Sequence, residues 1–381
     1  MRLILLMFLL VTSAFAQNNN LQLINWFAGA DIVASGDNLD QGADKENHLN
    51  DGMLVREFEF SAVSQIDQTW QGILTLAYHN ELQAEEEHLE VHEAMLFSSK
   101  LLPMANVKIG KFFLGFGRLN RFHRHDWIFT EAPLVQKSFF GNEGVKDTGF
   151  EYTRLLGGAL NWKLTVGLTS GGEFKHGEAH EEEGEEEHDH GGNPAPYEPT
   201  RYLRASNFIE FSTIEGIESG VSYVERRDGE GTRSSYAGLD LIYKKRVNQY
   251  IDRLVQFEVW QRTTKEMGEE SFQDLGAYLY FEKGLNRHHG LGLRFDFYLP
   301  ADLEEEEDHD EHGHSSIDGI TPMSNYHAIS LSYNYYNSEF MRTRFTLEHH
   351  NGVDVEEEEE SFQRAHLQFV FNIGAHPAHV Y

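Results

Sequence analysis

The stretch Leu291-Gly-Leu-Arg-Phe-Asp-Phe-Tyr-Leu299 decides the fold class, because bulky apolar residues alternate in it with polar or small ones. Successive side chains of a β-strand point to opposite faces, so a period of two predicts a strand with one apolar and one polar face. The same period recurs in Leu160–Thr169, Leu275–Phe281 and Leu367–Ile373. The sequence therefore predicts an all-β protein.

Two all-β architectures fit this alternation. A soluble sandwich buries the apolar face in a core, whereas a membrane barrel turns it to lipid and its polar face to an aqueous lumen. Many segments run for ten residues or longer and their polar rows carry full charges, which favours the barrel. We expect these charged residues to line the lumen: Lys163, Arg204, Glu210, Asp240, Arg294, Asp296, Arg342, Arg344 and Glu348.

The expected barrel has about 16 strands. Their starts are predicted near Leu21, Met53, Thr69, His88, Val107, Val145, Leu160, Arg201, Ile217, Arg233, Gln249, Ser271, Gly290, Met323, Glu339 and Ser361. Short turns and long, charged connections then alternate along the chain, which is typical of bacterial outer-membrane barrels. The prediction is a porin-like transmembrane antiparallel up-and-down β-barrel that spans residues 17–381.

Residues 1–16 have the pattern of a secretory signal peptide. Arg2 precedes an apolar run from Leu3 to Val11, and Ala14-Phe-Ala16 is a small-x-small cleavage site. The alternative, a retained helical anchor, is disfavoured because the run is short for a membrane helix. The chain has no cysteine, which excludes disulfides and thiolate metal sites and is compatible with the periplasm or the outer membrane.

Charge narrows the class of partner. The chain has 62 Asp and Glu against 31 Lys and Arg, a formal net charge of −31. Such a surface repels phosphate, so a nucleic-acid partner is excluded, and cations are the natural small partners.

Two of the long connections, 172–200 and 301–322, interleave acidic residues with histidine. Without thiolates, Zn²⁺ prefers imidazole nitrogen and carboxylate oxygen. We expect weak, exchanging metal sites here and no tightly bound cofactor, because neither tract has a fixed ligand spacing. The alternative is a solvated acidic loop with incidental histidines. The candidate ligands are His176, Glu178, His180, His188, Asp189, His190, His309, Asp310, His312 and His314.

The connection 117–144 is the densest chemical segment. In 16-stranded porins the third loop commonly folds into the lumen and narrows it, which would make this segment a constriction; the alternative places it on the rim. Its candidate residues are Arg118, Arg121, His123, Arg124, His125 and Asp126. Two His and a carboxylate could form a weak divalent-metal site. Three neighbouring Arg argue against a tight one, because they raise the cost of a cation.

Three stretches carry a family resemblance: Lys111–Trp127 with GFGRLNRFHRHDW, Phe139–Asp147 with FFGNEGVKD, and the GAHPAH ending at His379. They resemble bacterial outer-membrane proteins described as zinc-regulated, TonB-dependent outer-membrane receptors. The resemblance implies an outer-membrane barrel associated with zinc supply. Energised import is not expected, because we find neither a plug-sized segment nor an energy-coupling box near Asn18.

The resulting hypothesis is a bacterial outer-membrane channel for divalent cations, most plausibly Zn²⁺, with surface loops that capture the ion. One alternative is a general or anion-selective porin, since Arg residues line the expected pore. Another is a surface metal-binding or adhesion protein with a closed barrel. No catalytic constellation is present, so we expect no enzyme. Expected partners are membrane lipid, divalent metal ions and the barrel-assembly machinery, and a homotrimer by analogy of fold alone.

Overall fold

The computed structural model describes residues 24–38, 52–80, 88–158, 161–172, 198–227, 232–248, 250–265, 271–300, 321–355 and 358–374. These residues form sixteen strands. The strands are β1 Ile24–Asp37, β2 Gly52–Gln65, β3 Gln71–His79, β4 His88–Ser98, β5 Ala105–Phe113, β6 Lys146–Gly157, β7 Trp162–Thr169, β8 Glu198–Ser212, β9 Glu215–Arg227, β10 Arg233–Val247, β11 Tyr250–Lys265, β12 Phe272–Gly284, β13 His289–Leu299, β14 Thr321–Ser338, β15 Met341–Val355 and β16 Glu358–Gly374.

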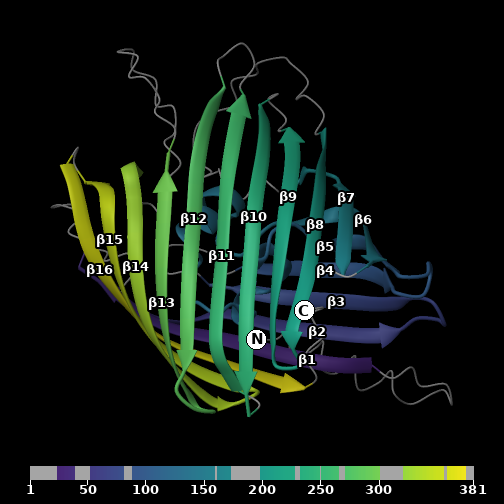
Figure 1. Cartoon of the computed structure of the whole chain (residues 1–381), viewed down its shortest axis with the longest axis horizontal. Helices are drawn as coiled ribbons and strands as arrows, with labels where there is room; N and C mark the ends of the chain where they lie inside the picture. Colours follow the sequence, from purple (N-terminus) through teal and green to yellow (C-terminus); the bar gives the residue numbers. More distant parts are fainter. Residues whose placement is uncertain are drawn as a thin grey trace.

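Each strand pairs antiparallel with the strands before and after it, and β1 pairs with β16, so the sheet closes into a barrel. At the seam, Ala30 of β1 lies opposite Phe371 of β16 and Phe58 of β2. In Figure 1 the strands β8–β13 run nearly upright while β1–β3 cross behind them, as expected for tilted strands on opposite walls of a barrel. Closure leaves no unpaired strand edge.

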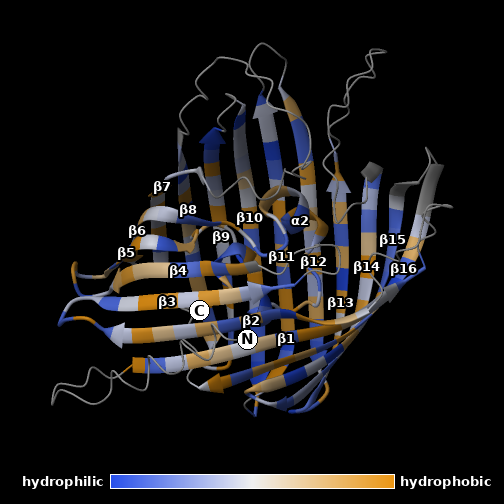
Figure 2. Ribbon diagram, turned by 180° about the vertical axis from the view of Figure 1, so that it is seen from behind, coloured by the Kyte–Doolittle hydropathy of each residue, from blue (hydrophilic) through white to orange (hydrophobic). Residues whose placement is uncertain are grey.

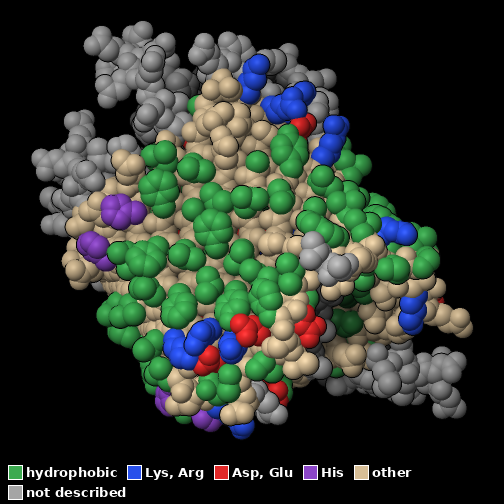
Figure 3. All heavy atoms as spheres, viewed as in Figure 1, with side chains coloured by type: hydrophobic (Ala, Val, Ile, Leu, Met, Phe, Trp, Pro, Cys, Tyr) green, Lys and Arg blue, Asp and Glu red, His purple; other side chains and the backbone are tan. Residues whose placement is uncertain are grey.

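The outer face of the barrel is apolar. Leu291, Phe295 and Leu331 are 43%, 45% and 54% exposed, whereas their lumen-facing neighbours are buried. Figure 3 shows hydrophobic side chains covering the middle of one face, with charged side chains toward its ends. A closed barrel that presents an apolar band outward is a transmembrane barrel, and this architecture belongs to the bacterial outer membrane. The membrane barrel, and not the soluble sandwich, is confirmed.

The strand count and the strand starts are also confirmed. The largest differences between predicted and observed starts are three residues, at Leu21 against Ile24, Arg201 against Glu198 and Ser361 against Glu358. The predicted signal peptide lies outside the described residues. All described residues belong to strands, their connections and one long loop, so the described part of the chain contains no plug domain and does not support a TonB-dependent receptor.

The connection between β5 and β6, residues 114–145, enters the barrel; we call it the third loop. It contains two short 3₁₀ helices, η1 Leu119–Arg121 and η2 Arg124–Asp126, and the helix α2 Leu134–Phe140. Figure 2 shows α2 inside the barrel, where it packs against β11, β12 and β13. None of the helices in the described ranges is long and apolar enough to cross a bilayer.

Candidate functional site

Asn120 closes the base of the third loop. Its side-chain nitrogen donates to the carbonyls of Leu114 and Val145, at 2.9 and 3.2 Å, and its Oδ1 accepts from the Val145 N–H at 2.6 Å. One buried side chain therefore ties both ends of the loop together. These bonds satisfy backbone groups that a loop inside a barrel would otherwise leave unpaired.

The loop turns into the lumen at Gly117. This glycine has a φ of +59°, and a Cβ here would lie 2.8 Å from both Glu258 and Trp260. The Glu258 carboxylate then accepts from the backbone N–H groups of Arg118 and Leu119 at the start of η1. A left-handed backbone and a close wall thus explain why the sequence places glycine here.

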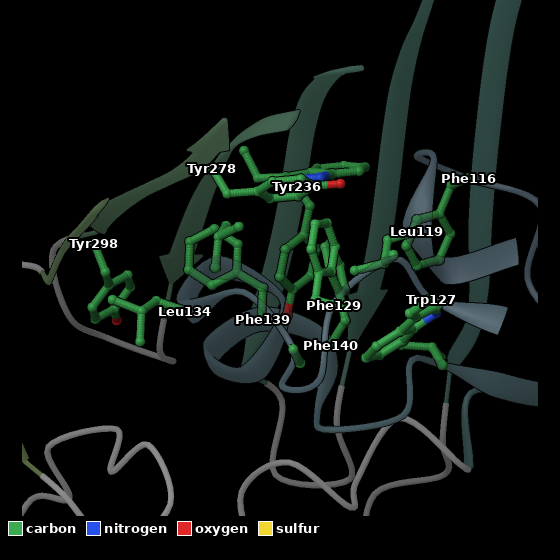
Figure 4. Packing of buried hydrophobic residues seen from close by; sticks show 14 of the residues in the cluster. Phe116, Leu119, Trp127, Phe129, Leu134, Phe139, Phe140, Tyr236, Tyr278 and Tyr298 are labelled. Carbon is green, nitrogen blue, oxygen red and sulfur yellow. The ribbon is translucent and has the colours of Figure 1, made fainter. Parts of the chain in front are cut away.

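Aromatic packing fixes the second half of the loop to the barrel wall. Phe140 of α2 contacts Phe116, Tyr236 and Trp260, with ring centroids 5.0, 5.3 and 4.9 Å apart. Phe129 packs against Tyr278 and Tyr280. Figure 4 shows Phe129 and Phe140 of the loop close to Tyr236 and Tyr278 of the wall. This aromatic cluster packs like the hydrophobic core of a soluble protein, although it lies inside a membrane barrel.

Gly276 on β12 makes room for this helix. A Cβ at that position would lie 2.6 Å from Cγ2 of Val135 and 3.2 Å from its Cα. The wall therefore has no side chain at the position where α2 approaches it, which allows close packing.

Three arginines of the third loop are matched by carboxylates of the wall or the loop. Arg118 and Arg121 each lie 3.3 Å from Glu218 of β9, and Arg124 lies 3.6 Å from Glu131. Glu218 is shared by Arg118 and Arg121, so the expectation that these arginines raise the cost of a cation at the neighbouring histidines stays a prediction.

Glu131 holds a buried network across the loop. It contacts Arg56 of β2 at 2.5 Å and Lys137 of α2 at 3.1 Å. Burial opposes ionisation of Glu131, but Lys137, Arg56 and Arg124 outweigh it and hold its pKa well below the usual range. The carboxylate is therefore ionised at neutral pH and links α2 to β2.

Other residues predicted to line the lumen contact the third loop or one another. Arg342 donates to the His125 carbonyl at 2.9 Å, and Arg344 donates to the Trp127 carbonyl at 3.4 Å. Arg294 donates to the Glu131 carbonyl at 2.7 Å. The remaining members form the ion pairs Arg204–Asp240, Arg294–Asp296 and Arg294–Glu348, while Lys163 is half-buried and Glu210 is exposed beside a turn.

A second, polar cluster lies where the first half of the third loop meets β2, β3 and β4. We call it the histidine–carboxylate cluster. Its rings form one continuous stack, with centroids 4.6 Å apart for His79 and His92, 5.9 Å for His92 and His123, and 5.6 Å for His123 and His125. Its members are His79, His92, His123 and His125 with Glu57, Glu59, Glu90, Glu93, Asp126 and Glu143.

Two β-bulges build the wall side of this cluster. In the pairing of β1 with β2, Arg56 has no partner residue on β1. In the pairing of β3 with β4, His92 has no partner residue on β3. A bulge lets two consecutive side chains face the same side of a sheet. Arg56 and Glu57 are both buried, and His92 and Glu93 both contact the loop histidine His123.

Burial and the neighbouring carboxylates have opposite effects on the pKa values of the two loop histidines, His123 and His125. Burial disfavours the charged form of His123, but Glu59 and Glu93 outweigh it and raise its pKa well above the usual value. Burial acts the same way on His125, where Asp126, Glu59 and Glu57 raise the pKa to about 9. The cluster therefore attracts positive charge, either as protons or as a cation.

His123, His125 and Asp126 were predicted from the sequence as site residues, whereas the wall residues of the cluster were not. Glu57 and Glu59 alternate with Phe58 and Phe60, so a period-two pattern was available to place both carboxylates in the lumen. The bulge at His92 breaks that period, and no signal in the sequence pointed to it. The predicted metal ligands in 172–200 and 301–322 lie outside the described residues.

Comparisons with known proteins agree with the architecture. No family model matches the chain. An uncharacterized protein of Aquifex aeolicus is 25% identical over 372 residues, which cover 89% of this chain and 72% of that protein.

Solved structures with a similar fold are outer-membrane porins and channels. An anion-selective porin from Comamonas acidovorans superposes with a TM-score of 0.60 at 10% identity, over 93% of this chain and 100% of that one. The channel DcaP of Acinetobacter baumannii gives 0.58 at 9% identity, over 94% and 99% of the two chains. OprB of Pseudomonas putida gives 0.57 at 9% identity, over 92% and 94%. At such identities the likeness shows a porin-like barrel fold.

Proposed function

We propose that this protein is a passive outer-membrane channel that favours divalent metal cations, with Zn²⁺ the foremost candidate. The observation that carries the proposal is the position of the histidine–carboxylate cluster. It joins the wall of the barrel to the third loop, which among the described residues is the long segment that enters the barrel, so an ion that reaches this junction meets carboxylate oxygens and imidazole nitrogens. These are the ligands that Zn²⁺ takes when thiolates are absent.

Net charge supports the same direction of selectivity. The chain carries a formal charge of −31, and clustered carboxylates raise the local concentration of cations. The acidic and histidine-rich connections 172–200 and 301–322 would collect ions before they enter. Calorimetry with ZnCl₂ tests that role: deletion of both tracts is expected to lower the number of zinc ions bound, and an unchanged number would contradict capture by these tracts.

A second candidate, an anion-selective porin, is favoured by one observation. Arg118, Arg121 and Arg204 converge on Glu218, so guanidinium groups outnumber carboxylates at that place. Asp240 offsets part of this excess through its pair with Arg204. The lumen thus has a basic wall as well as an acidic one, and the balance of the two sets the selectivity.

Reversal potentials across planar bilayers decide between the two candidates. In gradients of KCl and then of ZnCl₂, the full chain is expected to show cation preference, and stronger preference with the divalent ion. Replacing Glu57 and Glu59 with Gln should weaken that preference, whereas replacing Arg118 and Arg121 with Gln should strengthen it. A reversal potential of the opposite sign in both salts would refute a cation channel, and absence of conductance would favour a closed barrel.

The homotrimer and the role of the barrel-assembly machinery remain predictions. Cross-linking of the protein in native outer membranes tests the first, and accumulation of unfolded chain after depletion of the machinery tests the second.

A further inference from the structure

We propose that Glu59, His92, His123 and His125 form a specific binding site for one divalent transition-metal ion, of the zinc class, inside the barrel. The inference deepens the proposed function, since it assigns a defined site within the cluster that the channel is proposed to use. It differs from the weak sites expected in the surface tracts, because its ligands come from fixed elements: β2, β4 and the third loop.

Three imidazole nitrogens converge on a single carboxylate oxygen atom. Glu59 Oε2 lies 2.9 Å from Nδ1 of His123 and 3.5 Å from Nδ1 of His125. Nδ1 of His92 lies 3.9 Å from the same oxygen. Candidate ligand atoms of Glu59, His92 and His123 all lie within 4.8 Å of one another, and so do those of Glu57, Glu59 and His125. Small side-chain movements would bring such atoms to the 2.0–2.2 Å range of Zn²⁺ ligation.

The opposite ring nitrogens of two of these histidines face carboxylates. Nε2 of His123 lies 3.3 Å from Glu93, and Nε2 of His125 lies 3.7 Å from Asp126. Histidines that ligate metals usually direct their other nitrogen to a carboxylate, which fixes the tautomer and makes the ligand more basic.

His92 follows the same pattern through a second histidine. Its Nε2 lies 2.6 Å from Nε2 of His79, and Nδ1 of His79 lies 2.5 Å from Glu143. If Nε2 of His92 donates its proton to Nε2 of His79, and Nδ1 of His79 donates its proton to Glu143, then Nδ1 of His92 carries a lone pair. This nitrogen faces Glu59. The Nε2 partners of His92 and His123 therefore leave Nδ1 of each ring for a metal ion, whereas Nδ1 of His125, which lies 3.1 Å from Glu57, would exchange that carboxylate for the ion.

Two buried polar atoms of the cluster lack hydrogen-bond partners. Nδ1 of His92 and Oε2 of Glu57 make no hydrogen bond within the described part of the chain, and both residues are only 1% exposed. Buried polar atoms without partners are costly, and their presence in this cluster is consistent with a bound ion.

Charge explains why the ion belongs here and not deeper in the stack. Among the described residues, the ion pairs given for Glu57, Glu59 and Glu93 are with imidazoles, and the ammonium group of Lys108 acts on Glu93 without forming one of these pairs. Around His79 the situation differs, because Lys146 donates to both Glu90 and Glu143 at 2.8 and 3.1 Å. An ammonium group already neutralises that end, so a divalent cation gains most beside Glu59.

The test measures metal held by the full chain. Purified protein is loaded with ZnCl₂ and passed through a column that contains a chelator of intermediate affinity, to strip the weak sites. We expect about one equivalent to remain in the wild type, from the one four-ligand site. Glu59→Gln and His92→Gln should each lose it, since they remove a ligand but leave the surface tracts intact. Heat-modifiable migration on gels confirms that each variant is folded.

His350→Gln is the matched control. His350 is also a buried lumen histidine, but Tyr326 and Glu348 occupy its two nitrogens at 3.0 and 3.1 Å. The control should keep the wild-type metal content. Equal retention in Glu59→Gln and wild type, or no retention by the wild type, would overturn the site.

A second measurement does not depend on variants. Anomalous diffraction at the zinc edge from crystals of the wild-type chain should show a peak between Glu59, His92 and His123, and a map without that peak overturns the site. The channel proposal can fail separately. If the protein binds zinc but does not select divalent ions, the metal site is supported and the channel function is refuted. If the protein selects divalent ions but retains no zinc, the channel function is supported and the metal site is refuted.

Discussion

The two halves of the third loop meet the barrel in opposite ways. The second half, from Trp127 to Phe140, buries aromatic rings against β10–β13, as a soluble protein builds its core. The first half places His123 and His125 against the carboxylates of β2 and β4. Aromatic burial stabilises by about 25 cal/mol per Å² of apolar surface. Buried ionic groups return little net stability, because desolvation offsets their attraction.

This difference separates anchoring from function. The aromatic packing of the second half anchors the loop to the wall, whereas the polar side chains of the first half offer oxygen and nitrogen ligands. Four stacked imidazoles beside several buried carboxylates are an expensive arrangement if the only need is to fix a loop. If the two halves divide anchoring and binding in this way, substitutions in the aromatic half should lower stability more than substitutions in the polar half.

The largest effect is expected in the aromatic half. Phe140→Ala should lower the free energy of unfolding by about 3–5 kcal/mol, because it empties a ring-sized volume among Phe116, Tyr236 and Trp260. Urea unfolding in lipid vesicles measures this. Leu285→Ala, at a turn residue that is 53% exposed, is the control and should cost less than about 1 kcal/mol. Equal costs would show that the aromatic cluster is not an anchor.

Glu131→Gln should have the next largest effect, about 3 kcal/mol at pH 7, because Arg56 and Lys137 lose their shared carboxylate. The pKa of Glu131 is lowered in the folded state. Its stabilisation is therefore complete above the unfolded value near 4.3 and is lost as the pH falls through the folded value.

The difference between wild type and Glu131→Gln should accordingly be constant between pH 7 and pH 5 and should shrink below about pH 4. Unfolding experiments at each pH measure it. A difference that grows in acid would mean that the ion pairs with Arg56 and Lys137 are not the source of the effect.

Gly276→Ala should cost about 1–3 kcal/mol, since the added methyl group would overlap Val135 and push α2 from the wall. Gly172→Ala is the matched control, because a Cβ there meets no atom within 4 Å. Thermal unfolding followed by circular dichroism compares the two. Equal stability of both variants would show that α2 is not tightly seated.

The smallest effect on stability is expected at the polar half. In metal-free protein, Glu59→Gln should change the free energy of unfolding by about 1 kcal/mol or less, because nearby imidazoles can release protons when a carboxylate is removed. Added Zn²⁺ should then stabilise wild type but not the variant. A loss above about 3 kcal/mol without metal would indicate that Glu59 serves mainly as a partner of charged imidazoles.

The sequence carried most of the architecture. Alternation in segments such as Leu291–Leu299 was enough to place strand starts within three residues and to predict a closed barrel, because the period of two is a local property of extended backbone. The candidate site was only partly predictable. Alternation also placed Arg204, Asp240 and Arg344 on the polar face, but it could not say which of them meet each other.

The sequence by itself determined the barrel and which side chains of each strand face lipid or the lumen. Both follow from the alternation of neighbouring residues along the chain and from the preference of apolar side chains for lipid and of polar ones for water. Only the tertiary structure decided which wall residues the charged side chains of the third loop contact. At the bulge in β4, His92 and Glu93 both face His123, although 31 positions separate the two histidines. Such a meeting depends on a bulge in one strand and on the path of a distant loop, and neither is encoded in local periodicity.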